Sequence, residues 1–184
     1  MTKNNKNDYL FPELYGTIAA LVTDGEQASI LTDQGHNIKV NLDDPSAKCI
    51  EEYIEPPEEK VCKYYLFGPW IAVCITKDGF LGISLNTGDW VMYEILSKLH
   101  GVPTCVLFYA NVLILGLDSG SVHMYQVDSI QSLTAFDFES ENSKAIVVDN
   151  QAIVALDVMI RPSKQYLIAA TSEKVNIVEI QHFD

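Results

Sequence analysis

Short apolar segments recur along the whole chain, separated by small groups of glycine, aspartate, asparagine, serine or proline. Runs of Val, Ile, Leu, Tyr and Cys bounded by such residues are typical of β-strands, whereas the spacing of an amphipathic helix is almost absent. A helix of one or two turns near residues 93–99 competes with a strand there. The pattern predicts strands over residues 17–22, 27–32, 37–41, 49–54, 61–67, 70–76, 80–86, 89–96, 103–109, 112–117, 121–127, 131–138, 152–160, 165–171 and 174–180.

The predicted strands fall into three sets of four and a last set of three. In each set the second and third strands form a hairpin, and the first apolar positions after the hairpin turns are Ile38, Leu81, Val122 and Val175. These positions are 43, 41 and 53 residues apart, and the longest interval contains the polar stretch 139–150. A four-stranded unit of about 40–45 residues is the repeat of a β-propeller blade.

The hairpin turns contain residues that tolerate positive φ, such as Asp-Gly, Gln-Gly and Ser-Gly. The third hairpin reads Asp118-Ser119-Gly120-Ser121-Val122-His123-Met124-Tyr125-Gln126. It resembles the blade signature of the WD-repeat family, Asp-x-Gly-Thr-Val-x-Leu-Trp-Asp, and residues 77–85 and 172–179 are weaker copies. The chain departs from the family because it has no Trp-Asp dipeptide and no Gly-His pair at the start of a blade.

We therefore expect an all-β, WD-repeat-like propeller array of about four four-stranded antiparallel blades. A single domain over residues 9–184 follows a flexible polar N-terminus, residues 1–8. WD-repeat proteins usually have about seven blades, so the chain is a fragment, closes as a small ring, or is completed by a partner. The resemblance also implies that residues 9–15 supply the closing outer strand of the last blade. The expected blades cover approximately residues 17–55, 61–98, 102–138 and 151–181.

Charge narrows the classes of partner. The 184 residues include 12 Lys and Arg against 25 Asp and Glu, which gives a formal net charge of −13. Such a chain lacks the cations needed to bind a nucleic-acid backbone or anionic lipid directly. No apolar run reaches the roughly 18 residues that span a bilayer, and the polar start is not a signal peptide. We therefore expect a cytoplasmic or nuclear protein.

The cysteines give no indication of a metal site. Cys49, Cys62, Cys74 and Cys105 include no Cys-x-x-Cys pair, and no paired histidines accompany them. A zinc site normally needs two closely spaced pairs of ligands, so we expect no metal. Three of the cysteines lie in apolar segments, where a reduced thiol packs like a small hydrophobe. The chain also lacks a glycine-rich phosphate loop, so we expect no cofactor.

Acidic residues occur in all four hairpin turns, at Asp33, Asp78, Asp118 and Glu173. In WD-repeat rings this loop surrounds the central opening, so the resemblance implies one carboxylate per blade around it. Such a ring would attract the Lys or Arg side chains of a partner, although tight turns favour aspartate for geometric reasons alone. Trp90 follows a turn and is expected either in the core or as an exposed interface anchor.

These features favour a non-catalytic scaffold for protein–protein interaction, a propeller subunit of an intracellular complex. Its partner would be a Lys/Arg-rich segment or a chain that completes the propeller. The alternative is a small propeller enzyme, a hydrolase that uses carboxylates near the central opening as acid and base. We expect the scaffold, because no catalytic motif accompanies the four histidines. Fold alone does not decide between these functions.

Overall fold

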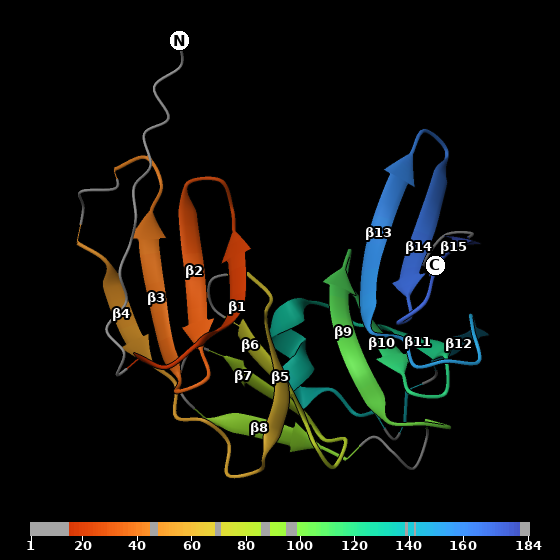
Figure 1. Cartoon of the computed structure of the whole chain (residues 1–184), viewed down its shortest axis with the longest axis horizontal. Helices are drawn as coiled ribbons and strands as arrows, with labels where there is room; N and C mark the ends of the chain where they lie inside the picture. Colours follow the sequence, from red (N-terminus) through yellow and green to blue (C-terminus); the bar gives the residue numbers. More distant parts are fainter. Residues whose placement is uncertain are drawn as a thin grey trace.

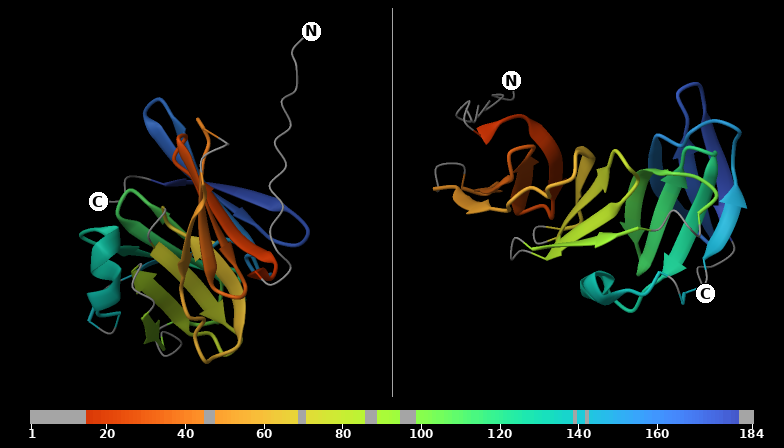
Figure 2. Two further views of the ribbon diagram at one scale, coloured as in Figure 1. Left: turned by 90° about the vertical axis from the view of Figure 1, so that its left-hand side faces the viewer. Right: turned by 90° about the horizontal axis from the view of Figure 1, so that it is seen from below.

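The structure is a computed structural model that describes residues 15–44, 48–68, 71–85, 89–94, 99–138, 140–141 and 143–180. Within these ranges the strands form four antiparallel sheets that follow one another along the sequence. Each sheet is one blade, and the four blades lie beside one another around a common centre (Figures 1 and 2). The expected all-β propeller arrangement of four blades is confirmed.

The strands of each blade pair in the order of the sequence. The first blade contains β1 (Ile18–Thr23), β2 (Gln27–Thr32), β3 (His36–Asn41) and β4 (Ile50–Tyr53). The second contains β5 (Val61–Leu66), β6 (Ile71–Thr76), β7 (Leu81–Leu85) and β8 (Trp90–Tyr93). The third contains β9 (Pro103–Tyr109), β10 (Val112–Leu117), β11 (Ser121–Gln126) and β12 (Lys144–Val147). The fourth contains β13 (Ala155–Arg161), β14 (Lys164–Ala170) and β15 (Val175–Ile180).

The central hairpins form where the turn residues predict them. Gly35, Gly79 and Gly120 have φ values of 88°, 86° and 82°, a region that favours glycine. A Cβ atom on Gly35 would also lie 2.1 Å from the carbonyl oxygen of Ile54. Glycine is therefore required at this turn by both its backbone conformation and its close contact with the segment that leaves the blade.

The core of the molecule lies between successive blades. Because side chains alternate across each strand, both faces of an internal blade pack against a neighbour. Among the described residues, no hydrophobic cluster joins the fourth blade to the first, and these two blades lie at opposite ends of the array (Figure 1). Buried members of the three inter-blade clusters are Leu31 and Ala72 for blades one and two, Ile83 and Leu115 for blades two and three, and Val122 and Leu167 for blades three and four.

The expected strand over residues 131–138 is wrong. Residues Ile130–Ala135 form a 3₁₀ helix, and the outer strand of the third blade is β12, within the stretch expected to be an insertion. Ser129 explains the helix, because its side chain accepts a hydrogen bond from the Ser132 N–H as an N-cap. Leu133 in this helix is fully buried against the second and third blades, so the apolar residues of the stretch cover a junction.

The fourth blade has three strands among the residues that the structure describes. Its third strand, β15, pairs with β14 on one side only. The proposed closing strand over residues 9–15 lies outside the described residues except for Tyr15, which packs on the first blade. The prediction that this segment completes the fourth blade therefore stays a prediction.

Candidate protein-docking surfaces

Two of the four predicted turn carboxylates occupy equivalent positions and form equivalent hydrogen bonds. Asp33 Oδ1 accepts from the Thr17 N–H at 2.9 Å, and Asp33 Oδ2 accepts from the Thr17 hydroxyl at 2.7 Å. Asp118 Oδ1 accepts from the Val102 N–H at 2.8 Å. Thr17 and Val102 each precede the first strand of their own blade, so both carboxylates fix the start of that strand. The hydrogen bond from the Thr17 hydroxyl lowers the pKa of Asp33 below its ordinary value.

The other two carboxylates occupy different positions in their turns. The equivalent of Asp33 in the second blade is Lys77, whose N–H donates to the Lys60 carbonyl at 2.8 Å. Asp78 lies one residue later and is exposed. In the fourth blade the turn is stabilised by the Thr171 hydroxyl, which accepts from the N–H groups of Glu173 and Lys174 at 3.3 and 3.2 Å. The Glu173 carboxylate therefore forms none of these turn contacts, whereas Asp33 joins its turn to the start of β1.

Trp90 lies at the contact between the first two blades. Its indole N–H donates to the Glu55 carbonyl at 2.7 Å, and its ring packs against a cluster that contains Leu31 and Ala72. The Tyr64 ring lies beside it at a centroid distance of 6.2 Å. Trp90 is half-buried, and its contacts with Glu55 and with the cluster of Leu31 join the second blade to the first. Its role as an interface anchor stays a prediction.

The innermost strands surround a pocket of about 480 Å³. It is lined by residues 20–22 of β1, residues 64–68 at the end of β5, residues 105–108 of β9 and residues 154–156 at the start of β13. We call this the central pocket. Most of the lining residues are apolar or aromatic, and Lys63 Nζ donates to the carbonyl of one of them, Val154, at 3.3 Å. The turn carboxylates are absent from this lining, and the sequence pattern offered no signal for the pocket.

The described residues contain no group of three or more His, Cys, Asp or Glu side chains arranged to hold a metal ion. His123 is buried in the third blade, where its Nδ1 lies 3.0 Å from the Ser143 hydroxyl and where burial lowers its pKa. Burial raises the pKa of the Cys74 thiol to about 12 and that of Cys105 to about 11, which keeps both protonated.

Cys62 does not follow the expectation for cysteines in apolar segments. It is exposed, whereas Cys74 and Cys105 are buried. The pairing of β5 with β6 is irregular between Val61 and Lys63, which leaves Cys62 without a partner residue in the register. A residue left unpaired by such an irregularity can turn outward from the sheet. All four cysteines are free thiols.

The sheet face of the fourth blade that points away from the third blade is largely apolar and exposed. We call it the outer face of the fourth blade, and it includes Tyr166, Ile168, Val175 and Ile177. Ile168 pairs with Ile177, as Ile114 pairs with Met124 in the third blade. Val175 and Ile177 are 62% and 60% exposed, whereas Val122 and Met124 are 0% and 3% exposed on the third blade. The two faces thus have the same pattern, but only the third blade has a neighbour on it.

The outer face of the first blade is, by contrast, partly covered. Leu21, which pairs with Ile30, and Tyr53, which pairs with His36, are 61% and 60% exposed on it. Its buried side chains are Ile30, Ile38 and Val40, and Tyr15 and Cys49 pack against them. The Tyr15 ring stacks on His36 at a centroid distance of 4.4 Å. The Tyr15 hydroxyl donates to Glu51 Oε2 at 2.6 Å, and His36 Nδ1 lies 2.8 Å from Glu51 Oε1. These contacts hold the segment before β1 against the first blade.

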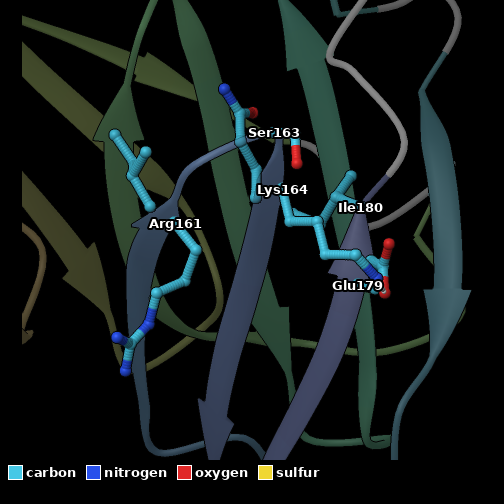
Figure 3. A pocket seen from close by; sticks show the side chains of 7 residues that line it. Arg161, Ser163, Lys164, Glu179 and Ile180 are labelled. Carbon is cyan, nitrogen blue, oxygen red and sulfur yellow. Dashed lines mark hydrogen bonds and ion pairs between the residues drawn. The ribbon is translucent and has the colours of Figure 1, made fainter.

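A second hollow lies at the β13–β14 turn, with a volume of about 460 Å³. Lys164 Nζ lies 2.8 Å from Glu179 Oε2, and Figure 3 shows these two side chains directed toward each other. Arg161 extends away from that pair (Figure 3). The charges of Lys164 and Glu179 in this hollow therefore offset each other, and this exposed ion pair is worth little energetically.

No helix among the residues that the structure describes is both long and apolar enough to cross a membrane. No protein-family model matches the sequence, and a search of curated proteins found no match. Membership of the WD-repeat family therefore stays a resemblance carried by the hairpin motifs.

Solved structures resemble the chain in fold. The computationally designed protein Ika4 is 14% identical, with a TM-score of 0.53 over 90% of this chain and 92% of Ika4. The designed protein Ika8 is 14% identical, with a TM-score of 0.50 over 89% of this chain and 46% of Ika8. YCF48, solved bound to D1 peptide, is 9% identical, with a TM-score of 0.55 over 91% of this chain and 51% of YCF48. The chain therefore spans about half the length of Ika8 and YCF48. At these identities the likeness establishes the fold alone.

Proposed function

We propose that the protein is a non-catalytic scaffold for protein–protein interaction, and that its partner docks on the outer face of the fourth blade. The observation that carries this proposal is the exposure of Val175 and Ile177 at positions whose counterparts in the third blade are buried. Exposed contiguous apolar surface of this kind marks interaction sites in soluble proteins. A partner that supplies a further blade would bury both side chains and continue the array.

The wall of the central pocket supports the non-catalytic part of this proposal. The described residues that line it include no carboxylate, histidine or lysine that could act as an acid or base. Asp33 and Asp118 are instead hydrogen-bonded at the strand starts. YCF48, a structure similar in fold, was solved with a bound peptide, which is compatible with interaction as the use of such an array.

The test compares two exposed isoleucines as sites for a charge. Proteins captured from cells by the wild-type chain are identified, expressed separately and titrated against purified variants. Ile177→Lys places an ammonium group on the outer face of the fourth blade and should weaken binding at least about tenfold, because that charge would be desolvated. Ile50→Lys is the matched control, since Ile50 is 56% exposed on β4 of the first blade and should leave binding unchanged. Equal binding by both variants would refute docking on this face.

A Lys/Arg-rich partner segment is the second candidate, and the net charge of −13 favours it. The structure sharpens its test, because Asp78 and Glu173 are exposed and are not needed for their turns, whereas Asp33 stabilises the start of β1. Asp78→Asn with Glu173→Gln should weaken binding of a basic peptide, most clearly at low salt. Unchanged binding of that peptide at low ionic strength would leave the turn acids without a binding role.

A further inference from the structure

The outer edge of the fourth blade differs from the outer edges of the other three blades. In those blades the outermost strands, β4, β8 and β12, are four residues long, and each pairs antiparallel with the third strand of its own blade. In the fourth blade the outermost described strand is β15, whose six residues pair with β14 in continuous register. No described residue pairs with the other edge of β15. The backbone N–H and C=O groups on that edge are therefore a template for a further strand.

The side chains of β15 give this edge little protection against pairing. Proteins usually protect exposed edges with short strands, prolines, lysines or bulges. β15 contains one charged residue, Glu179, whose carboxylate lies 2.8 Å from Lys164 Nζ in the neighbouring strand. Val175 and Ile177 on the same strand are 62% and 60% exposed. A strand added at this edge would place its own side chains beside both of them, as cross-strand neighbours.

The fourth strands of the other blades indicate which side chains suit this position. Val175 corresponds to Val122 of the third blade, which pairs with Ile146. The corresponding residue of the second blade is Leu81, which pairs with Tyr93, and the next pair on the same face of that blade is also apolar. In the first blade, where the residue on the corresponding face is polar, its partner is charged. A strand beside β15 should therefore carry apolar side chains at alternate positions.

The hairpin turn of the fourth blade adds a requirement for charge. In the first blade the residue that follows β4, Ile54, donates its N–H to the Gly35 carbonyl of the turn. Val148, which follows β12, makes the same hydrogen bond to Gly120 in the third blade. The corresponding turn of the fourth blade contains Glu173, which is exposed and forms no ion pair with another described residue. A Lys or Arg that follows the added strand would lie beside this carboxylate.

We propose that a partner completes the fourth blade with an extended segment that pairs antiparallel with β15, carries apolar side chains at alternate positions and continues into Lys or Arg. Main-chain hydrogen bonds to β15 would supply affinity, and the alternate side chains and the basic residue would supply specificity. This inference rests on the proposed function, because the segment would anchor the partner that covers the outer face of the fourth blade. It fails separately if the partner docks on that face without adding a strand.

The probe is a fluorescein-labelled peptide with the proposed pattern, Thr-Val-Thr-Tyr-Lys-Lys, titrated with the full chain by fluorescence anisotropy. In an antiparallel pair, the N–H groups of alternate residues point toward the partner strand and the others point away. One control peptide is therefore N-methylated on the backbone at its Val and Tyr, and a second at its two Thr residues. The unmethylated peptide should bind saturably with a Kd below about 1 mM, and only one of the two methylation patterns should weaken binding at least about tenfold.

Variants of the chain locate the bound peptide. Ile177→Lys should weaken binding of the unmethylated peptide at least about tenfold. Ile50→Lys is the matched control, because Ile50 is 56% exposed on the outermost strand of the first blade, and it should leave the affinity unchanged. Glu173→Gln should weaken binding about two- to fivefold at low salt, and should not affect a peptide that has Gln in place of both Lys residues.

Absence of saturable binding, or equal effects of the two methylation patterns, would overturn the proposal. If neither pattern weakens binding but Ile177→Lys does, the proposed docking face stands and strand addition is wrong. If Ile177→Lys binds the peptide as well as the wild type does, the peptide does not meet this edge and the proposal is wrong. A tenfold gain in affinity in Phe11→Lys would mean that the chain's own N-terminal segment occupies the edge, which would also overturn a partner segment.

Discussion

The two ends of the array differ although both are faces of antiparallel blades. At the first blade, Tyr15 stacks on His36 and donates to Glu51, and Ile38 beneath is 3% exposed. At the fourth blade, Val175 and Ile177 face solvent. Repeat proteins bury a continuous core between neighbours, so their terminal units need a cap or a partner. The comparison teaches that this chain covers part of one end with Tyr15, whereas no described residue packs over Val175 and Ile177 at the other.

Because of this difference, a docking chain would meet different obstacles at the first and the fourth blade. A second chain that met the first blade would have to displace Tyr15 from its contacts with His36 and Glu51. Among the described residues, none packs over Val175 and Ile177 at the fourth blade. Apolar burial is favourable at about 25 cal/mol for each Å² removed from water, so the docking proposed for the fourth blade would not have to displace a described segment.

The largest expected effect is on stability, because Ile38 at the first blade is buried whereas Ile177 at the fourth blade is exposed. Ile38→Asp would place an unpaired carboxylate among Ile30 and Val40, and should lower the free energy of unfolding by about 3–5 kcal/mol. Ile177→Asp, at the other end, should change it by less than about 0.5 kcal/mol, because Ile177 is exposed. Urea denaturation of both variants measures the contrast. Similar losses in the two would mean that the outer face of the fourth blade is buried in solution.

A smaller effect is expected from Tyr15, which covers the first blade. Tyr15→Ala removes the stacking on His36 and the hydrogen bond to Glu51, and should lower the melting temperature. Tyr15→Phe keeps the ring and should lower it less. Thermal denaturation distinguishes the two variants. If Tyr15→Ala were as stable as the wild type, the segment before β1 would not hold this end closed.

The turn acids give the next comparison. Asp33→Asn keeps an acceptor for the Thr17 N–H but loses the one for the Thr17 hydroxyl, and should cost about 1 kcal/mol. Glu173→Gln, in the equivalent hairpin of the fourth blade, should lie within about 0.5 kcal/mol of the wild type, because Thr171 stabilises that turn. Thermal unfolding measured at one pH and one salt concentration tests both. If Glu173→Gln destabilised the protein more than Asp33→Asn, the conclusion that Asp33 stabilises the start of β1 and that Glu173 has no such role would be wrong.

Acidification should loosen the first blade. The hydrogen bonds from Tyr15 and His36 lower the pKa of Glu51 in the folded protein below its unfolded value, which is about 4.3. Its contribution to stability is therefore present above that pH and is lost as the pH falls through the folded pKa. Melting temperatures between pH 6 and pH 3 should fall less steeply for Glu51→Gln than for the wild type.

The sequence predicted the repeat because its strongest local signals are also the requirements of the fold. The turn glycines Gly35, Gly79 and Gly120 adopt positive φ in the structure, as the motif requires. The alternation of Val122 and Met124 with His123 and Tyr125 reflects a blade with a neighbour on each face. Both features are local in sequence, and a local pattern is therefore sufficient to find them.

Other features depend on contacts that are distant in sequence. Residues 131–138 have the apolar content of a strand, but an N-cap at Ser129 and the burial of Leu133 make the segment a 3₁₀ helix. The difference between Asp33 and Glu173 depends on what precedes each blade, 16 residues away in the case of Thr17. The central pocket combines segments from all four blades. The pocket can be recognised only once the blades are arranged in space.

The hairpin turns have a consequence for how such a chain can grow. Asp33 contacts Thr17, where the first blade begins, and the Gly35 carbonyl accepts from the Ile54 N–H, where that blade ends. Asp118 and Gly120 make the same two contacts in the third blade, to Val102 and to Val148. In each of these blades the first and the last residues therefore contact the same hairpin turn. The ends of domains that tolerate insertion also lie close together. A gene segment that encodes one blade can be copied in tandem, and the new copy needs only an apolar neighbour to pack on, which the fourth blade offers.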